Sequence, residues 1–425
     1  MPRHLYYKDS LVDKILRVAY FPDSFHEVNG VAMTSKKLVR FAAEREYPFL
    51  CVHAGPETSV SQDGSVTYLS LKRSPVSFSM DEGLKYDPLF HRHFSRVKKQ
   101  LEEFRPDVVH ITGLNDVSII GAHVSRSLDL ALIASWHTNI HEYAAKRLNK
   151  RLRFLSERSR LKLTETVEKR VLQGANLFYR IPYMILAPNR ELLEMLQKGT
   201  GRAARLMVRG VDTDLYSPEK RTVHDDIFRL GFVGRLRAEK SVRMLPELEK
   251  KLFDAGKTNF EFLVIGEGNE RGYLEKNMTS AVLPGFLDGE DLAREFANMD
   301  VFVFPSETET YGNVVQEANA SGVPCIVTNQ GGPKYIVQDR KTGYIANNVD
   351  EFAKFVIELM NDSAKLSEMK AASRKFALGR SWDSVFEEVY RSYDDVCGIL
   401  AHKRTLRKKP LLKTVASSID PKILL

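Results

Sequence analysis

Cysteine and long apolar runs are both scarce in this sequence, and each scarcity excludes a class of protein. The 425 residues contain three cysteines, Cys51, Cys325 and Cys397, an odd number spread over the whole chain. Such spacing argues against a disulfide framework and favours a reducing cytoplasm. No run approaches the roughly 18 uncharged apolar residues that cross a membrane. The first 20 residues lack the apolar core of a signal peptide, so we expect a cytoplasmic protein.

The length of the chain predicts more than one domain. At 425 residues it exceeds what one compact core accommodates, and two domains of about 200 residues each are expected. The residues are 43% hydrophobic and 28% charged, which is ordinary for a soluble globular protein.

Short apolar runs alternate with helical patterns along the chain. The runs are Leu16–Tyr20, Phe49–Val52, Asp107–Ile111, Leu130–Ser135 and Met184–Ala187 in the first half, and Arg229–Val233, Glu261–Ile265, Val301–Phe304 and Cys325–Val327 in the second. This rhythm predicts parallel, doubly wound sheets. Two such series in succession predict an α/β fold of two facing Rossmann-like domains.

Breaks in this pattern divide the chain into four parts. Gly210, Pro218 and a run of charges interrupt it near 209–226, so we expect one domain over 15–208 and a second over 209–380. Residues 381–400 predict one amphipathic helix, which we expect to pack back on the first domain. The last 25 residues, 401–425, are basic and predict a loosely ordered tail.

The most informative segment is 305–324, PSETETYGNVVQEANASGVP, which follows a predicted buried strand. It places Glu309 in the strand-to-helix loop and Glu317 about one turn into the next helix. Backbone N–H groups from Gly312 to Val314 favour an anion or a group of hydroxyls. Open α/β sheets bind ligands at this end of their strands. The segment therefore suits a sugar carried on a diphosphate, although most glutamates lie on solvated surfaces.

Three other loops at predicted strand ends carry groups that suit the same ligand. Gly30 opens a helix after the first strand and lets the backbone approach a phosphate closely. Arg235 and Lys240 flank the loop after the first strand of the second half, so both can reach one diphosphate. His137 follows the fourth strand of the first half, and we expect a ligand contact there rather than a purely structural role.

Three further patterns are misleading. Gly266-Glu267-Gly268 resembles part of a dinucleotide-binding sequence, but the next glycine, Gly272, comes one residue late. Asp212-Thr213-Asp214 resembles a metal-binding carboxylate pair, but in an interdomain connection it is more typical of a turn or helix cap. His137 and His141 have the i,i+4 spacing of zinc ligands without the glutamate of a zincin. We therefore expect no catalytic metal.

With these motifs in view, the chain resembles the retaining GT-B sugar transferases of glycosyltransferase family 4, from about Leu16 to Tyr393. The most specific motifs are the 305–324 segment, GRLRAEK at 234–240 and PGFLDGEDL at 284–292. WHTNIHEY at 136–143, VNGV at 28–31 and RGVDTDLYSP at 209–218 are similar to the subgroup of GDP-mannose-dependent alpha-mannosyltransferases and sulfoquinovosyltransferases.

Two departures from the family pattern leave the identity of donor and acceptor open. Lys334-Tyr335 stands where an acidic residue often follows the GGP turn. The first loop contains the unusual pair His26-Glu27. Neither departure alters the implied class of reaction.

The resemblance implies a role for each candidate residue. Arg235 and Lys240 would hold the diphosphate, and the backbone of Gly30 would meet the same phosphates across the cleft. Glu317 would take the ribose hydroxyls, and His137 would contact the transferred sugar from the first domain. The remaining groups are Glu309 with the amides of Tyr311, Gly312, Asn313 and Val314, which would hold the sugar hydroxyls, and the backbone of Gly285, Phe286 and Leu287, which would lie beside the base.

The implied reaction transfers a hexose of mannose or glucose type from a GDP- or UDP-linked donor to a lipid or glycan hydroxyl. The anomeric configuration is kept by front-face attack, in which the leaving phosphate oxygen helps remove the acceptor proton. No cofactor is implied, and His137, Glu309, Arg235 and Lys240 are the residues expected to act in catalysis. Two alternative classes remain. One is another enzyme of the same fold, a nucleotide-sugar epimerase or a pyridoxal-type phosphorylase, but neither the acid–base groups of the first nor the Schiff-base lysine of the second is visible. The other is a non-catalytic sugar-binding protein, which nothing in the sequence excludes.

The segment 146–170 contains ten basic residues and three acidic ones. Interleaved leucines and Phe154 would let a basic helix lie among lipid headgroups. A solvated basic face is the alternative, and a nucleic-acid surface is disfavoured because stacking aromatics other than Phe154 are missing. Resemblance to lipid-directed transferases favours a peripheral position at an anionic membrane, on the inner face of the cell membrane.

Overall fold

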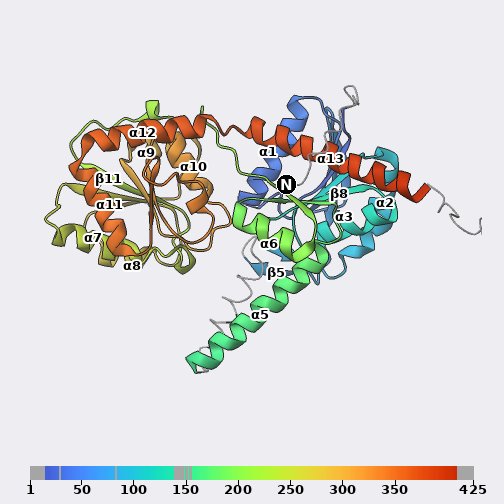
Figure 1. Ribbon diagram of the computed structural model, residues 1–425, viewed down its shortest axis with the longest axis horizontal. Helices are drawn as coiled ribbons and strands as arrows, with labels where there is room; N and C mark the ends of the chain where they lie inside the picture. Colours follow the sequence, from blue (N-terminus) through green and yellow to red (C-terminus); the bar gives the residue numbers. More distant parts are fainter. Residues whose placement is uncertain are drawn as a thin grey trace, which may run out of the picture.

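The computed structural model describes residues 15–27, 30–81, 84–137, 148, 152 and 156–408. Two α/β domains lie side by side, each built around its own sheet (Figure 1). The chain leaves the first domain after β10 (Ala203–Leu206) and returns to it at the end through α13 (Trp382–Lys408), which runs along its surface (Figure 1).

An eight-stranded sheet forms the centre of the first domain. Its order is β10, β9 (Met184–Ala187), β8 (Ala131–Ser135), β7 (Val108–Ile111), β1 (Val18–Phe21), β2 (Phe49–Gly55), β4 (Val66–Lys72) and β3 (Ser59–Asp63). All neighbours are parallel except β3, which runs antiparallel to β4 and which the sequence analysis did not predict. Its sequence, SVSQD, is polar and almost wholly exposed, so it carries no apolar run. A separate hairpin pairs β5 (Phe78–Asp81) with β6 (Leu84–Tyr86).

A six-stranded, fully parallel sheet forms the centre of the second domain. Its order is β13 (Ala281–Gly285), β12 (Phe260–Ile265), β11 (Phe228–Val233), β14 (Val301–Phe304), β15 (Cys325–Thr328) and β16 (Gly343–Ala346). The order reverses between β11 and β14, as in doubly wound nucleotide-binding folds, which bind ligands beside the loops at that reversal. A ligand site is therefore expected beside the loops after β11 and β14.

Helices flank both sheets and complete the predicted α/β class, with two Rossmann-like domains (Figure 1). The first domain has α1 (Gly30–Glu44), 3-10 helix η1 (Phe90–His93), α2 (Phe94–Phe104), α3 (Asp116–Ser127), α5 (Glu157–Phe178) and α6 (Arg190–Thr200). The second has α7 (Met244–Asp254), α8 (Arg271–Asn277), α9 (Gly289–Asn298), α10 (Asn313–Ala320), α11 (Val349–Asn361) and α12 (Ser363–Leu378), with 3-10 helices η2 (Pro218–Lys220), η3 (Ala238–Lys240) and η4 (Pro333–Tyr335). Among the residues described, no helix is long and apolar enough to cross a membrane.

The C-terminal helix α13 packs back on the first domain, as predicted. Its buried side chains are Val385, Phe386, Val389, Tyr393, Val396 and Leu400, and they share one apolar core with β1, β2 and α1. The helix does not end at 400 as expected but continues to Lys408, so residues 401–408 of the predicted tail are helical. The rest of that tail, 409–425, lies outside the described residues.

The two chain crossings between the domains run beside each other. The Val211 N–H donates to the Arg380 carbonyl at 3.0 Å, and Val211 forms a parallel β-bridge with Ser381. A Cβ on Gly210 would lie 2.5 Å from the Cα of Trp382, so only glycine allows this approach. The domains are therefore connected by two segments that are hydrogen-bonded to each other and closely packed.

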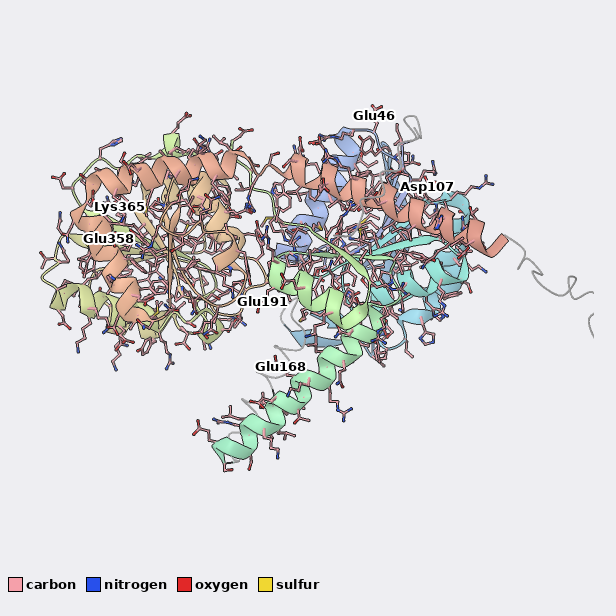
Figure 2. All side chains as sticks on the ribbon, viewed as in Figure 1. Glu46, Asp107, Glu168, Glu191, Glu358 and Lys365 are labelled. Atoms are coloured by element: carbon pink, nitrogen blue, oxygen red, sulfur yellow. The ribbon has the colours of Figure 1, made fainter. Side chains whose placement is uncertain are left out.

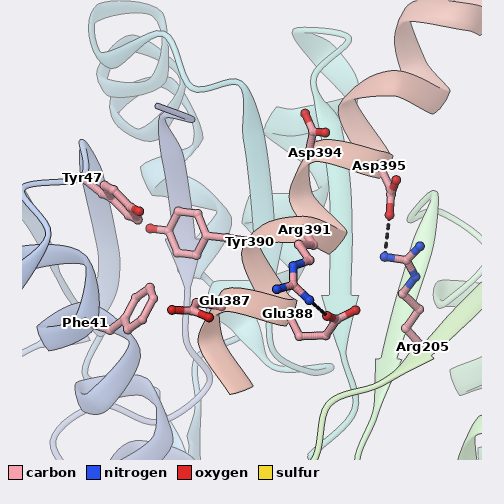
Figure 3. A pocket seen from close by; sticks show the side chains of 9 residues that line it. All are labelled: Phe41, Tyr47, Arg205, Glu387, Glu388, Tyr390, Arg391, Asp394 and Asp395. Carbon is pink, nitrogen blue, oxygen red and sulfur yellow. Dashed lines mark hydrogen bonds and ion pairs between the residues drawn. The ribbon is translucent and has the colours of Figure 1, made fainter. Parts of the chain in front are cut away.

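An open pocket lies where α13 crosses α1 and β10 (Figure 3). Tyr47 and Tyr390 meet there at 5.0 Å between ring centroids. Four of the charged lining residues form ion pairs with one another, Arg205 with Asp395 at 2.5 Å and Arg391 with Glu388 at 2.8 Å (Figure 3). None of its lining residues is a candidate site residue, so the pocket belongs to the packing of α13.

Candidate active site

The loops after β11 and β14 meet at the point where the second sheet reverses its strand order. The ammonium group of Lys240 forms an ion pair with the carboxylate of Glu309. The Thr308 hydroxyl donates to the Glu239 carbonyl at 3.3 Å, which ties the two loops together beside that pair. The structure thus brings into contact two residues that the sequence analysis selected from segments about 70 residues apart.

Lys240 and Arg235 give this place a positive character. Burial and the Arg235 guanidinium lower the pKa of Lys240 to about 8, while the carboxylate of Glu239 acts in the opposite direction. Arg235 is more exposed, and its nearest carboxylate is that of Glu239, at 3.6 Å. A buried ammonium beside an accessible guanidinium can bind an anionic ligand at two points.

The glycines after β12 have a structural explanation. A Cβ on Gly266 would lie 2.0 Å from the Gly234 carbonyl oxygen, and one on Gly268 would lie 2.2 Å from that of Leu236. The Leu236 N–H also donates to the Glu267 carbonyl at 2.9 Å. These glycines therefore let one backbone pack directly on the loop that carries Arg235, which accounts for their spacing without a dinucleotide.

A second pair of glycines supports the Glu309 loop. The Gly332 N–H donates to the Glu309 carbonyl at 2.6 Å. A Cβ on Gly332 would lie 2.3 Å from the Thr310 carbonyl oxygen, and one on Gly331 would lie 2.9 Å from that of Glu307. The GGP turn thus packs directly against the Glu309 loop and supports it, a role that was not predicted from the sequence.

The helix that follows Glu309 begins without a side-chain cap. Gly312, with a φ of 98°, occupies the position before α10, and among the described residues no side chain accepts a hydrogen bond from the helix start. The Asn313 amide group lies across from the first helix of the other domain, because a Cβ on Gly30 would come within 3.2 Å of its nitrogen. Gly30 and the start of α10 therefore face each other across the domain boundary.

Glu317 lies further along α10, next to the first domain. Burial raises the pKa of its carboxyl to about 7, and the Lys37 ammonium opposes this shift only weakly. No carboxylate hydrogen bond is recorded for Glu317 within the described part of the chain. Because the pKa of this carboxyl group is raised, a ligand that donates hydrogen bonds to it would stabilise its ionised form.

The ring of His137 is part of a buried hydrogen-bond chain. Arg209 donates to its Nδ1, and its Nε2 lies 2.7 Å from the Ser135 hydroxyl. That hydroxyl lies 3.0 Å from Nε2 of His110, whose Nδ1 lies 2.7 Å from the Tyr393 hydroxyl on α13. Burial, the Arg209 charge and His110 hold the pKa of His137 well below its usual range, so the ring is neutral.

This series of hydrogen bonds bears on the expectation that the His137 side chain contacts a ligand. Both ring nitrogens have partners inside the protein, so the side chain has no free nitrogen for a sugar. Its carbonyl, instead, accepts a hydrogen bond from the Thr310 hydroxyl at 3.1 Å. His137 therefore meets the Glu309 loop through its main chain.

Arg209 is a site residue whose side chain the sequence analysis did not consider. It is 4% exposed, burial lowers its pKa to about 10, and one guanidinium nitrogen, Nη1, has no partner among the described residues. Its carbonyl accepts from the Tyr311 hydroxyl at 3.3 Å. Tyr311 thus points its side chain at the interdomain connection, and only its amide remains for a ligand. The sequence feature that could have indicated Arg209 is its position as a charged residue directly before Gly210 in the interdomain connection.

The segment expected beside the base lies at the end of β13. Gly285 has a φ of 92° and accepts from the Gly266 N–H at 2.8 Å, so it joins this segment to the glycine loop. Phe286 is 63% exposed, and Leu287 packs against the core. The segment is therefore anchored at Gly285 and Leu287, while the Phe286 side chain faces solvent.

The patterns set aside earlier can also be placed. The Asp212 carboxylate accepts from the Leu215 N–H at 3.0 Å, which confirms the turn expected for Asp212-Thr213-Asp214. Within the described ranges, no three His, Cys, Asp or Glu side chains are placed to hold a metal ion. Val28, Asn29, His141 and much of 146–155 lie outside the described residues.

Family comparisons agree with this geometry. The family described as Glycosyltransferase Family 4 matches residues 28–215, and the one described as Glycosyl transferases group 1 matches 227–362. A GDP-mannose-dependent alpha-mannosyltransferase of Mycolicibacterium smegmatis is 30% identical over 413 residues, covering 92% of this chain and 100% of the relative. The sulfoquinovosyl transferase SQD2 of Arabidopsis thaliana is 29% identical and covers 68% of this chain and 56% of the relative.

Solved structures share the fold at low identity. A sucrose-phosphate synthase from Thermosynechococcus elongatus superposes with a TM-score of 0.66 at 17% identity, over 90% of this chain and 100% of that one. HepE of Anabaena, in complex with UDP, gives 0.63 at 15% identity, over 89% and 100%. The fold of two facing domains and the Lys240–Glu309 pair at the reversal of the second sheet agree with the matched families. The chain therefore belongs to glycosyltransferase family 4 and is a glycosyltransferase.

Proposed function

We propose that the protein transfers a hexose from a nucleoside-diphosphate sugar to an acceptor hydroxyl with retention of the anomeric configuration. The observation that carries the proposal is the contact between Lys240 and Glu309 at the reversal of the second sheet. In this contact, a cation that suits a phosphate lies beside a carboxylate that suits sugar hydroxyls. A donor whose diphosphate and sugar are adjacent satisfies both groups at once.

Each group has a defined part in this reaction. Lys240 and Arg235 bind the diphosphate and stabilise the charge that grows on it as the bond from the sugar carbon to the phosphate oxygen breaks. The acceptor oxygen bonds to the same carbon on the same face, and its proton passes to the leaving phosphate oxygen. Glu309, paired with Lys240, accepts hydrogen bonds from sugar hydroxyls. Because the leaving phosphate oxygen takes the acceptor proton, the reaction needs no nucleophile of the two-carboxylate glycosidase type.

Glu317 and the end of β13 complete the donor site. The ribose hydroxyls donate to Glu317, whose carboxylate has no hydrogen-bond partner among the described residues and whose raised pKa means that such donors favour its ionised form. The base lies along Gly285, Phe286 and Leu287. Relatives named as GDP-mannose-dependent mannosyltransferases favour a GDP-linked mannose, and a UDP-linked hexose of glucose type is the alternative.

A panel of nucleotide sugars tests the reaction. The purified protein is incubated with GDP-mannose, UDP-glucose and related donors, with and without lipid and glycan acceptors. Release of nucleoside diphosphate that depends on an acceptor, with a product of retained configuration by NMR, is the expected result. An isomerised nucleotide sugar would indicate epimerisation, and binding without turnover would indicate a sugar-binding protein; either outcome contradicts the proposal.

We further propose that the acceptor is lipid-linked and that α5 lies on an anionic membrane surface at the inner face of the cell membrane. In Figure 1, α5 projects away from both sheets. Leu161 and Leu163 are 46% and 42% exposed, and the neighbouring side chains of Lys162, Lys169 and Arg170 are also exposed. Each basic residue near an anionic surface contributes on the order of 1 kcal/mol, so a cluster can hold an enzyme there reversibly.

Co-sedimentation with vesicles tests this position. Binding should require anionic lipid, decrease with salt, and weaken in Lys162→Glu and Leu161→Ser. Lys99→Glu, an exposed lysine on α2, is the matched control and should bind as the wild type does. Equal pelleting with neutral vesicles, or none with either kind, would refute the membrane proposal.

A further inference from the structure

The start of α6 in the first domain is bonded to the loop that carries Glu309 in the second. Asn189, directly before α6, has two partners. Its Oδ1 accepts from the Leu192 N–H at 2.9 Å and caps the helix, and its Nδ2 donates to the Thr310 carbonyl at 2.9 Å. Asn189 is 5% exposed. One buried side chain therefore holds a helix end and, across the domain boundary, the residue next to Glu309.

Glu191, in the first turn of α6, contacts the same region from the surface. The Tyr335 hydroxyl donates to its carboxylate at 2.9 Å, and the Lys334 ammonium lies 3.4 Å from it. Figure 2 places Glu191 at the junction of the two domains. Lys334 and Tyr335 are the residues that replace the acidic group common after the GGP turn. The two residues that depart from the family pattern, Lys334 and Tyr335, are thus the partners of Glu191 on the first domain.

These contacts converge on one loop. Asn189 holds it directly at Thr310, and Glu191 holds η4, the short helix that follows the GGP turn. That turn supports the loop through the hydrogen bond from Gly332 to the Glu309 carbonyl. The Glu309 loop therefore receives contacts from the first domain, one directly at Thr310 and one through η4 and the GGP turn.

We propose that Asn189 and Glu191 are positioning residues for sugar transfer, which align the Glu309 loop of the second domain from the first. This inference rests on the proposed function, because alignment matters only if Glu309 meets the reacting sugar. Asn189 contributes the larger share, since its hydrogen bond is buried. The pair of Glu191 with Lys334 is exposed and contributes less, because water screens it.

The two functions of Asn189 can be separated by substitution. Asn189→Ser keeps a side-chain oxygen that caps α6 nearly as well as asparagine, but serine does not reach Thr310. We expect kcat to fall about tenfold, the effect of one lost hydrogen bond to a buried partner. Affinity for nucleoside diphosphate should change less than about twofold, since the cations and Glu317 are untouched. Asn348→Ser is the matched control, because Asn348 caps α11 in the same way, through Glu351.

The contact of Glu191 is tested by exchange of charge. Glu191→Lys should lower kcat about threefold, and adding Lys334→Glu should restore most of the loss by re-forming the pair in reverse. Glu194→Gln, on the same helix, changes the local charge without this contact and should leave kcat as in the wild type. Failure of the second substitution to restore activity would overturn the role of Glu191.

The failure of this inference and that of the proposed function give different results. If the wild type transfers sugar and Asn189→Ser has the same kcat, or loses no more activity than Asn348→Ser, the positioning role is wrong. If the wild type transfers no sugar, the proposed function is wrong, and small-angle scattering decides the interdomain contact. A larger radius of gyration in Asn189→Ser than in Asn348→Ser would support the contact, and equal radii would overturn it.

Discussion

At the scale of the residue, Lys240 combines burial with an ion pair at the place where phosphate charge would develop. Lys240→Met keeps most of the volume of the side chain and removes its charge, so we expect kcat/KM to fall about a hundredfold or more. Steady-state rates of nucleoside diphosphate release measure the effect. Lys276→Met, an exposed lysine of α8, should have wild-type activity. Near-normal turnover in Lys240→Met, with an unchanged melting temperature, would contradict the assignment.

Glu317 predicts how donor binding depends on pH. Its pKa of about 7 means that the free protein binds a proton there at lower pH, whereas a bound ribose favours the ionised form. Binding therefore releases a proton below pH 7, and affinity for nucleoside diphosphate should fall up to about tenfold per pH unit as the pH decreases below 7. Calorimetric titration from pH 5.5 to 8 measures it. Glu317→Gln should bind more weakly at pH 8 and lose this part of the dependence; an identical pH profile would exclude Glu317.

Arg209 predicts the ionisation state of His137. In Arg209→Met the donor to Nδ1 and the neighbouring charge are lost, so the pKa of His137 should rise toward its ordinary value near 6.5. Arg209→Lys keeps a cationic donor and should leave the ring neutral. NMR titration of the histidine ring signals follows the change. A ring that stays neutral to pH 5 in Arg209→Met would show that burial alone determines its state.

At the scale of the element, the GGP turn and the Glu309 loop act as one unit. Gly332→Ala would place a Cβ 2.3 Å from the Thr310 carbonyl oxygen, so the loop has to move. We expect a loss of about 1–3 kcal/mol in the free energy of unfolding and a marked loss of kcat. Gly272→Ala, where a Cβ meets nothing within 4 Å, is the control. Equal activity in the two variants would separate the turn from the site.

The elements also show why the sequence predicted only part of the site. Arg235, Lys240 and Glu309 could be chosen because each follows a strand whose apolar run is visible, and parallel strands end at one edge. Ser135 and His137 alternate at i and i+2, a spacing that could have suggested that they share a face. Asn189 also follows a visible strand, Met184–Ala187, but its partner Thr310 lies in the other domain. Arg209 and His137 likewise become neighbours only through tertiary packing, so the sequence could not reveal either contact. The polar strand β3 was missed because it is exposed and has no apolar periodicity.

At the scale of the whole molecule, the site is assembled by two domains and by cations of the chain itself. Lys240, Arg235 and the uncapped start of α10 supply positive charge for a diphosphate, so we expect transfer to proceed without a divalent ion. The rate should stay within about twofold of its original value in excess chelator. Complete loss that magnesium or manganese restores would overturn this prediction.

The position of α13 has a consequence for how the chain is made. The first domain begins at the N-terminus, yet part of its apolar core, Phe386 and Tyr393, comes from the last helix. A ribosome releases that helix only after the second domain has been synthesised. The earlier domain therefore waits with an open apolar surface over β1, β2 and α1, and a chain cut before residue 382 keeps that surface exposed. Nascent chains that have not yet reached residue 382 should therefore need chaperones until α13 covers this apolar surface.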